Sequence, residues 1–389
     1  FLMIRRPRRS PLFPYTTLFR SVAFCITVAA GLAEVPFRAR TRPSLIPARR
    51  PAIPIGQLVA IPTPLGLPPV PIPADNPPTR ETIALGRRLF FDKILSKDGT
   101  VSCASCHDPK HAFADPRRVS LGVNETPGTR QGMVVVNAAY HLTQFWDGRV
   151  TTLEEQAAGP VANPVEMAHS LAGVERKLMA NPKYVKLFAE AWGPGRITYE
   201  MVAKSIASYE RTLISGNSPF DRYFYGGDKT AMSESAIRGL KFYLNPSLKA
   251  ANCVSCHRID KDFATFTEEK FHNTGVAWDP DNNQVTDMGR FAVTGNPRQP
   301  GAFKVPTLRN IALSAPYMHN GSQKTLEEVI DFYAAGGRPN PFLSNDVSAK
   351  NWPDIPPDQL EQAKKDLVEF MKALTGEEPP GASPPEDEE

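Results

Sequence analysis

The chain has 389 residues and a formal net charge of +4, and its composition is ordinary for a globular protein except for 39 prolines. The first 50 residues hold ten arginines, no lysine and one acidic residue, so they carry +9 while the remainder carries −5. The basic isoelectric point therefore belongs to the leader, and the charge of the body argues against nucleic acid as a partner.

Residues 1–34 are predicted to be a leader outside the folded protein. Residues 1–21 are interpreted as an artefact, because the stretch SPLFPYTTLFRS (10–21) resembles translated sequencing adapter. The apolar run VAFCITVAAGLA (22–33) is typical of a signal peptide and is too short to span a bilayer as a mature helix. We expect Cys25 to be removed with this run. The leader thus predicts an exported, periplasmic protein with no transmembrane anchor in the mature chain.

The body is predicted to be mainly α, with long loops and little β, because alternating strand-like runs are nearly absent. Thirteen prolines lie between Pro36 and Pro78, which predicts an extended tether or surface wrap over 35–74. The acidic, proline-rich residues 377–389 are predicted to be disordered. Amphipathic helices are predicted over 79–92, 171–192 with a break near Pro182, 198–214, 233–245, 325–337 and 356–376.

The helix TLEEVIDFYAAGG (325–337) has clear sequence signals at both ends. Thr325 and Glu328 are spaced as a capping box, and two glycines supply the stop. One face carries Leu326, Val329, Ile330 and Tyr333 at helical spacing. A buried tyrosine hydroxyl needs a partner, so Tyr333 is either a core residue or a ligand.

Two CxxCH motifs follow predicted helices in the same order, helix, loop, motif, which indicates an internal duplication. They are Cys103, Cys106 and His107, and Cys253, Cys256 and His257. Two thiols at this spacing form thioethers to the vinyl groups of haem, and the histidine next to them binds the iron. The alternatives are a redox-active dithiol or a four-cysteine zinc site. The duplication predicts domains over 75–230 and 231–376.

From 75 to 376 the sequence resembles the bacterial di-haem cytochrome c peroxidases and their MauG-type relatives. The motifs that carry the resemblance are the two CxxCH, WDGR (146–149) with the Gln and Glu that follow it, VPTLRNIALSAPYMHNG (305–321), and the helix that begins at 325. The resemblance implies two cytochrome c-like domains, each with one covalently bound haem c. The first domain would be peroxidatic and the second would transfer electrons.

The resemblance also implies the roles of four residues near the first haem. Trp146 would relay electrons between the haems, and Pro160 would lie on the distal side. Glu166 would move a proton between the oxygens of H2O2, and Gln156 would orient the peroxide. Judged on the residues alone, Gln156 also fits a surface position next to a second capping box formed by Thr152 and Glu155, and Glu166 fits a solvated one.

Two positions depart from many of the peroxidases. Sixteen residues after the first haem histidine they carry a second histidine, and this chain has Val123. The first haem is therefore expected to be five-coordinate without prior reduction, as in the MauG-type members. Fourteen residues after His319, where the peroxidases have a methionine, this chain has Tyr333, the residue that MauG-type members use as a distal ligand. Met288 and Met318 are the competing ligands of the second haem.

The remaining histidines are given supporting roles. His111 and His141 are expected at the surface or beside a haem propionate, and His272 and His319 are expected to donate or accept hydrogen bonds near the second haem. The family often binds Ca²⁺ through an Asn side chain and two backbone carbonyls. The corresponding residues here are Gln131, Ser314 and Pro316. Calcium is therefore implied, with a glutamine side chain, one methylene longer than asparagine, as the amide ligand.

Three functions follow as hypotheses. The first is a di-haem peroxidase that reduces H2O2 at the N-terminal haem, with electrons from a small cytochrome c or cupredoxin through the C-terminal haem. The second is a MauG-like enzyme that uses H2O2 to oxidise a residue on a partner protein. The third is a non-enzymatic di-haem electron carrier, which the spacing of Trp146, Gln156 and Glu166 argues against.

Overall fold

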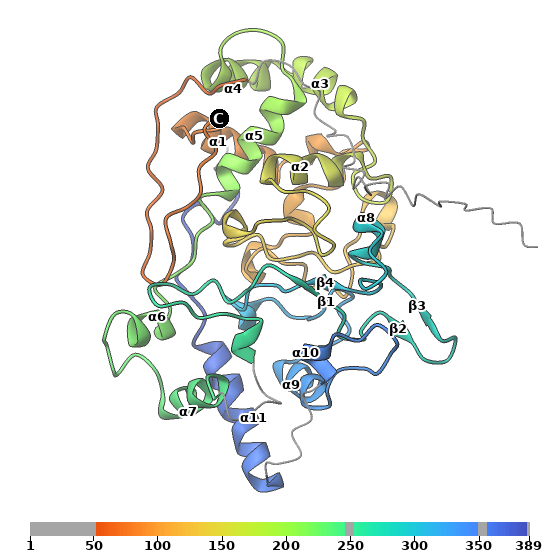
Figure 1. The fold of residues 1–389 in the computed structure, drawn as a ribbon. Coiled ribbons are helices and arrows are strands. Elements are labelled where there is room, and N and C mark those ends of the chain that lie inside the picture. Colours follow the sequence, from red (N-terminus) through yellow and green to blue (C-terminus); the bar gives the residue numbers. More distant parts are fainter. Residues whose placement is uncertain (1–51, 246–252, 349–355, 387–389) are drawn as a thin grey trace, which may run out of the picture. The chain divides into compact units, whose positions relative to one another are not determined.

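The computed structural model describes residues 52–245, 253–348 and 356–386 (Figure 1). The predicted signal peptide, with Cys25, lies outside these ranges. Among the helices within them, none has the length and apolarity that a membrane span requires. The helices are α1 (Arg80–Phe91), α2 (Leu153–Ala162), α3 (Leu171–Met179), α4 (Pro182–Trp192), α5 (Tyr199–Glu210), α6 (Pro219–Phe224), α7 (Glu234–Tyr243), α8 (Phe291–Thr294), α9 (Leu326–Ala334), α10 (Asn345–Ser348) and α11 (Pro357–Lys372).

The described strands are four pieces of two residues each, which confirms the prediction of a mainly α chain with little β. They are β1 (Phe271–His272), β2 (Trp278–Asp279), β3 (Gln284–Val285) and β4 (Phe303–Lys304). β1 pairs antiparallel with β4, and β2 with β3. The six predicted helices are present, and the predicted break in 171–192 lies between α3 and α4, where Asn181 caps α4 and Pro182 is its first residue.

The capping boxes of α2 and α9 are only half formed. Thr152 accepts the N–H of Glu155, and Thr325 accepts the N–H of Glu328, as predicted. Each glutamate, however, reaches one residue beyond the cap, because its carboxylate accepts the N–H of Thr151 or Lys324. The same deviation occurs in both halves of the chain.

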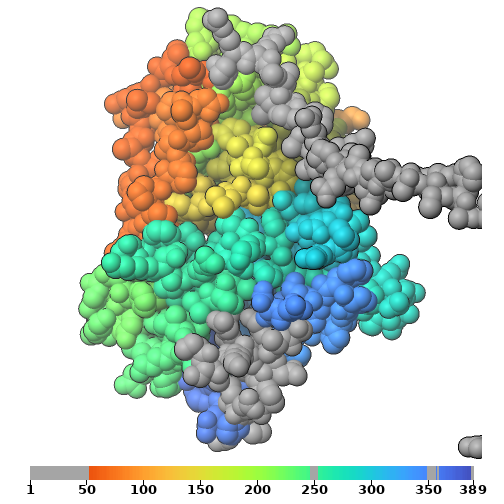
Figure 2. Space-filling model, viewed as in Figure 1, coloured from red at the N-terminus to blue at the C-terminus, as the bar shows by residue number. Residues whose placement is uncertain are grey.

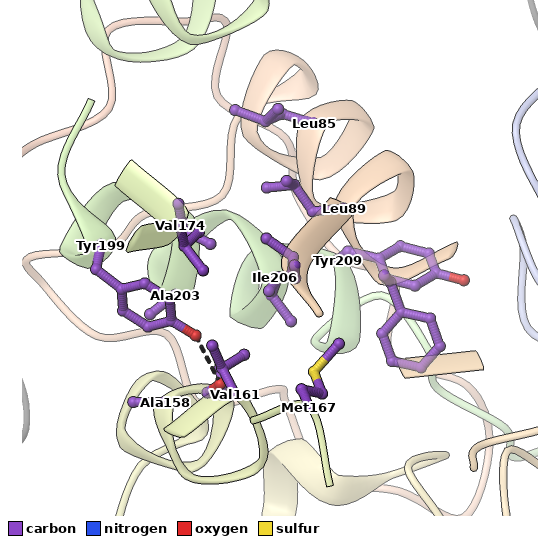
Figure 3. Close-up of a cluster of buried hydrophobic side chains, with 14 of the residues drawn as sticks. Leu85, Leu89, Ala158, Val161, Met167, Val174, Tyr199, Ala203, Ile206 and Tyr209 are labelled. Atoms are coloured by element: carbon purple, nitrogen blue, oxygen red, sulfur yellow. Dashed lines mark hydrogen bonds between the residues drawn. The ribbon is translucent and has the colours of Figure 1, made fainter. Parts of the chain in front are cut away.

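The first hydrophobic core packs α1 and α5 against α2, α3 and α4. Figure 3 shows side chains of α1, α2, α3 and α5 gathered together. The hydroxyl of Tyr199 in α5 donates to the carbonyl of Ala157 in α2 at 2.8 Å. The helices α1 and α5 approach closely at Gly86, where a Cβ atom would lie 1.8 Å from the carbonyl oxygen of Ser205. Glycine is therefore required at this crossing.

The second core repeats this arrangement with α7 and α11. Gly239 of α7 lies against the backbone of Asp366 in α11, where a Cβ atom would be 2.0 Å from its carbonyl oxygen. The core is rich in fully buried aromatic rings, namely Phe220, Tyr243, Phe266 and Phe370. Phe220 belongs to α6, so by side-chain packing the second half already includes α6, which precedes the domain boundary predicted at 230/231.

The duplication extends to the centre of the molecule, with an offset of 173 residues. The segment around Trp146 repeats around His319: each contains an asparagine in the left-handed conformation, Asn137 or Asn310, and each leads into a helix, α2 or α9. The two copies bond to each other reciprocally. The N–H of Gln131 donates to the carbonyl of His319 at 2.8 Å, and the N–H of Lys304 donates to that of Trp146 at 2.9 Å.

The described part of the proline-rich segment, residues 52–74, runs along the surface from α4 to α6 and back towards α1, as the orange stretch in Figure 1 shows. Figure 2 shows this stretch at the surface. Its surface-wrap interpretation fits this course. The carbonyl of Gly66 accepts a bond from Arg309, whose guanidinium also pairs with Asp221 at 2.8 and 2.9 Å. The arginine side chain is 1% exposed, so this buried ion pair fastens the wrap to the second half.

The segment 377–386 differs from the disorder predicted for 377–389. The hydroxyl of Tyr209 donates to the carbonyl of Gly381 at 2.8 Å, Ala382 is buried, and Arg87 bonds to Ser383. Composition did not reveal these partners, because they belong to α1 and α5. Residues 387–389 lie outside the described ranges.

Candidate functional site

The first CxxCH motif opens onto a cavity of about 1090 Å³. Cys103 begins a 3-10 turn, Cys103–Ser105, which follows a loop after α1, and Cys103, Cys106 and His107 all line the cavity. The second motif begins the turn Cys253–Ser255, and its three residues line a separate cavity of about 210 Å³. Because the two cysteine pairs line different cavities, they do not form one four-cysteine zinc site.

Each motif histidine is fixed in the tautomer that an iron ligand needs. Nδ1 of His107 lies 3.0 Å from the carbonyl oxygen of Phe113 and 2.9 Å from that of Met133. Nδ1 of His257 lies 3.0 Å from the carbonyl oxygen of Phe266. Carbonyls only accept, so each Nδ1 carries the hydrogen and each Nε2 keeps its lone pair for a metal. Burial lowers the pKa of His107, which also favours the neutral ring.

The four residues assigned to peroxide chemistry come together on the wall of the first cavity. Gln156 and Pro160 project from α2, Glu166 lies on the loop that follows this helix, and Trp146 lies on the loop before it. The sequence therefore predicted a set of residues that shares one cavity with Cys103, Cys106 and His107. Their roles in catalysis stay predictions.

The carboxylate of Glu166 is oriented by a residue that the sequence analysis missed. Nδ2 of Asn163 donates to Oε1 of Glu166 at 2.7 Å, and Oδ1 of Asn163 accepts the N–H of Val165 at 3.1 Å. Asn163 is the C-cap of α2. A polar residue three positions before Glu166 was the available signal.

Val123, the position where many peroxidases have a distal histidine, is 6% exposed and packs in the first core. Its N–H donates to the carbonyl of Glu166 at 2.8 Å. The loop from 119 to 128 is thereby joined to the segment that carries the acid. Apart from His107, the histidines on the cavity wall within the described ranges are His141 and His319.

The face of α9 predicted to be buried is a wall of the second cavity. Leu326, Val329, Ile330 and Tyr333 all line it, together with Met318. Met288, the other competing ligand, lines the first cavity instead. Burial raises the pKa of Tyr333, and within the described residues no hydrogen-bond partner of its hydroxyl is found. With the offset of 173, Tyr333 occupies the position that Pro160 occupies in the first half.

Trp146 and His319 line both cavities at the centre of the molecule. Their rings meet edge to face with centroids 6.4 Å apart, and His319 stacks on Phe303 at 3.6 Å. Nε1 of Trp146 donates to the carbonyl of Gln131 at 2.9 Å. Burial lowers the pKa of His319 to about 4, so this ring is neutral at physiological pH.

A buried ionic cluster between the two cavities was not predicted as such. Nδ1 of His141 lies 2.6 Å from Oε1 of Glu269, and Nζ of Lys304 lies 3.0 Å from its Oε2. The His141 side chain is 6% exposed, so its predicted surface position is wrong, while the predicted place beside a propionate stays open. His111 is at the surface, as predicted, with a bond of 3.1 Å to Asp108.

His272 lines the second cavity, as predicted, and bonds to Glu268 at 2.7 Å. The residues implied as calcium ligands, Gln131, Ser314 and Pro316, also share the wall of this cavity. Nε2 of Gln131 donates to the carbonyl of Asp115 at 3.0 Å, which fixes the amide. The set contains no carboxylate and three of the six to eight oxygens that Ca²⁺ takes. A calcium ion would need further oxygens, so calcium stays a prediction.

Comparisons with known proteins identify the family. Residues 80–230 match the family model of the di-haem cytochrome c peroxidases. Cytochrome-c peroxidase IdrP1 of Denitromonas iodatirespirans is 36% identical over 344 residues, 81% of this chain and 87% of that one. The chain belongs to the di-haem cytochrome c peroxidase and MauG family. Methylamine utilization protein MauG of Methylorubrum extorquens is 37% identical over 309 residues, 79% of this chain and 82% of that one.

A solved structure gives the same result for the fold of this family member. A MauG-like protein associated with microbial copper homeostasis is 35% identical, with a TM-score of 0.72 over 83% of this chain and 98% of that one. The chain is thus an enzyme of the cytochrome c peroxidase family, which acts on H2O2. The family implies two haem c groups. Two cavities, each lined by a CxxCH motif with the required histidine tautomer, fit two such groups.

Proposed function

We propose that the chain is an exported di-haem c-type enzyme in which H2O2 reacts at the first cavity. One haem would be attached through Cys103 and Cys106 with His107 as iron ligand, and the second through Cys253 and Cys256 with His257. The observation that carries the proposal is the shared wall that joins Trp146, Gln156, Pro160 and Glu166 to the first motif. A bound haem would supply the iron at which the O–O bond is cleaved.

The residues of the chain would manage the protons and the geometry. Glu166 would take a proton from one peroxide oxygen and return it to the other, with its carboxylate oriented by Asn163. The amide of Gln156 would hold the peroxide by hydrogen bonding, and Pro160 would offer no donor or charge at its position. Trp146 lines both cavities, which supports its assignment as the electron relay between the two haems.

Two sources of electrons remain as candidates. A small cytochrome c or cupredoxin would make the enzyme a peroxide-detoxifying peroxidase, while a residue on a partner protein would make it MauG-like. Tyr333 favours the second candidate, because its phenol lines the second cavity where the peroxidases have methionine. The absence of histidine at Val123 supports the same choice. Calcium at Gln131, Ser314 and Pro316 would belong to either enzyme.

The test is to add stoichiometric H2O2 to the oxidised, haem-loaded protein and follow the absorption spectrum. We expect a fast shift without prior reduction. Reaction only after half-reduction would favour the peroxidase that needs activation, and no reaction would favour the electron carrier. Glu166→Gln should slow the step by about 10²–10⁴-fold, while Glu155→Gln, in the first turn of α2 and outside both cavity walls, should not. A near wild-type rate in Glu166→Gln would remove the role assigned to this acid.

A further inference from the structure

Glu210 is a buried acid on the wall of the first cavity that the proposed chemistry does not use. It is the last residue of α5 and is 5% exposed. Its Oε2 atom is buried, and no hydrogen-bond partner of that atom is found within the described residues. An unpaired buried carboxylate is costly, whereas the neutral acid is far less so. The location therefore favours the protonated form.

The neighbouring cation forms no ion pair with Glu210. Arg211, the next residue, directs its guanidinium to Glu154 with bonds of 2.7 and 3.1 Å, and Asn76 donates to the same carboxylate at 2.6 Å. Glu210 also stands at the carboxyl end of a helix, where the backbone dipole disfavours negative charge. Burial raises the pKa of Glu210, the Arg211 charge lowers it and the Glu154 charge raises it, with a net pKa of about 8.

We propose that Glu210 is a proton-binding site whose occupancy follows the redox state of the first haem. The inference rests on the proposed function, because it requires a haem in the first cavity. When a reductant delivers one electron to that cavity, one proton from solvent binds a carboxylate oxygen of Glu210. When the electron is withdrawn, the same proton returns to solvent. No other bond forms or breaks.

The coupling follows from electrostatics. Adding an electron makes the cavity more negative by one charge, which disfavours a second negative charge on its wall and so strengthens proton binding. By thermodynamic reciprocity, a bound proton then favours the reduced state to the same extent. The reduction potential of the first haem should therefore fall with rising pH in the range where Glu210 titrates.

Other ionisable groups near this site can be told apart. Arg211 and Glu154 are paired with each other, and Tyr209, the preceding residue, directs its hydroxyl to the carbonyl of Gly381. Cys103, from the 3-10 turn, would be a thioether in the loaded protein and would not titrate. Lys304 has its pKa lowered by burial to about 8, but it lines both cavities, so it would affect both haems. Glu210 lines the first cavity and would affect the first haem more strongly.

The experiment is a potentiometric titration of both haems in the haem-loaded protein between pH 6 and 10, for wild type, Glu210→Gln and Glu155→Gln. We expect the wild-type potential of the first haem to fall as pH rises above about 8. Glu210→Gln, which keeps the shape of the neutral acid, should lose that dependence at the first haem only. Glu155→Gln, a surface substitution of the same kind, should keep it.

A second readout is the infrared difference spectrum between the oxidised and reduced forms. Above pH 8 it should contain the carbonyl band of a protonated carboxylic acid, which should be absent in Glu210→Gln. A wild-type potential independent of pH, or an unchanged slope and band in Glu210→Gln, would overturn the inference. Either result, with two covalent haems and a fast peroxide reaction, would leave the proposed function standing. If the potential of the first haem depended on pH through Glu210 but the protein did not react with H2O2, the proposed function would fail and the inference about Glu210 would stand.

Discussion

At the scale of single residues, the orientation of the Glu166 carboxylate depends on a neighbouring asparagine. Glu166 lies on a loop, and a loop carboxylate is free to rotate unless something holds it. Nδ2 of Asn163 donates to this carboxylate at 2.7 Å. Oδ1 of Asn163 accepts the N–H of Val165, which fixes the rotamer of the asparagine itself. A hydrogen bond to a charged group contributes about 1.5–3 kcal/mol.

We therefore predict that Asn163→Ala slows the reaction with H2O2 by about 10- to 100-fold while the haems stay attached. The rate is measured by rapid mixing of peroxide with the oxidised protein. The control is Asn181→Ala, which removes the cap of α4, a helix that contributes no residue to either cavity wall. This control should lose about 1 kcal/mol of stability and keep its rate. A wild-type rate in Asn163→Ala would show that the bond does not orient Glu166.

Glu210 and Glu154 give a second prediction at this scale, and the size of the Glu210 effect on stability depends on pH. The folded-state pKa of Glu210, about 8, is above its ordinary value of 4.5. Between pH 4.5 and 8 this group ionises in the unfolded chain but not in the folded protein. The free energy of unfolding therefore falls as pH rises through this range. Glu210→Gln should be as stable as wild type at pH 4 and more stable at pH 8, by about 2–5 kcal/mol.

Denaturant titrations at the two pH values measure this difference. Glu154→Gln is the contrasting variant, because it weakens a buried pair with Arg211 and should cost about 3–5 kcal/mol at neutral pH. If Glu210→Gln were destabilised at pH 8 as much as Glu154→Gln, the acid would be charged and paired in the folded state.

At the scale of elements, each half depends on one close helix crossing. The approach of α1 to α5 leaves no space for a side chain at Gly86. Alanine there would favour the helix by about 1 kcal/mol but would push α1 away from α5. We predict a net destabilisation of about 1–3 kcal/mol for Gly86→Ala, measured by thermal or denaturant unfolding.

The matched control for this crossing is Gly128→Ala, where the nearest atom to the new Cβ is 3.4 Å away, an ordinary contact. Its stability should stay within about 0.5 kcal/mol of wild type. Equal effects of the two substitutions would mean that the α1 and α5 helices can separate at little cost.

The elements also show how the two halves came to differ in chemistry. The helices α2 and α9 start with the same residues, Thr-Leu-Glu-Glu, and deviate from a full capping box in the same way. One helix then presents Gln156 and Pro160 to its cavity, and the other presents Val329 and Tyr333. The repeated parts form the frame, and the residues that differ are those proposed to decide what each haem binds.

At the scale of the whole molecule, the sequence predicted the motifs and missed the contacts between distant segments. Cysteine spacing, helical periodicity and the resemblance placed both haem motifs and the wall of the first cavity. They did not reveal the pairing of His141 with Glu269, because a hydrogen-bond partner 128 residues away leaves no periodic pattern. They also did not reveal Asn163, whose bond to Glu166 depends on the path of the loop after α2, or the burial of Glu210, which depends on how α5 packs. The spacing from His319 identified Tyr333 as a possible ligand. The cavity that Tyr333 lines became known only from the structure.

The cluster of His141, Glu269 and Lys304 provides the last prediction, because it joins His141 to a glutamate 128 residues further along the chain. Burial alone would raise the pKa of Glu269, but the bonds from His141 and Lys304 outweigh it and lower the pKa to about 2. A lowered carboxyl pKa stabilises the fold above pH 4.5, and the contribution is lost as pH falls towards 2. Its sign is opposite to that of Glu210, so the pH dependence of the whole molecule contains two opposing terms.

Glu269→Gln should therefore destabilise the haem-loaded protein by about 3 kcal/mol at pH 6, and the difference from wild type should shrink as pH falls from 4.5 to 2. Denaturant unfolding across this range measures it. Glu190→Gln, which removes an exposed partner of Lys186 at 4.0 Å, should change stability by less than about 0.5 kcal/mol at any pH. A Glu269→Gln difference that did not vary with pH would mean that the loss came from packing. The carboxylate would then not be what holds the two halves together between the haem cavities.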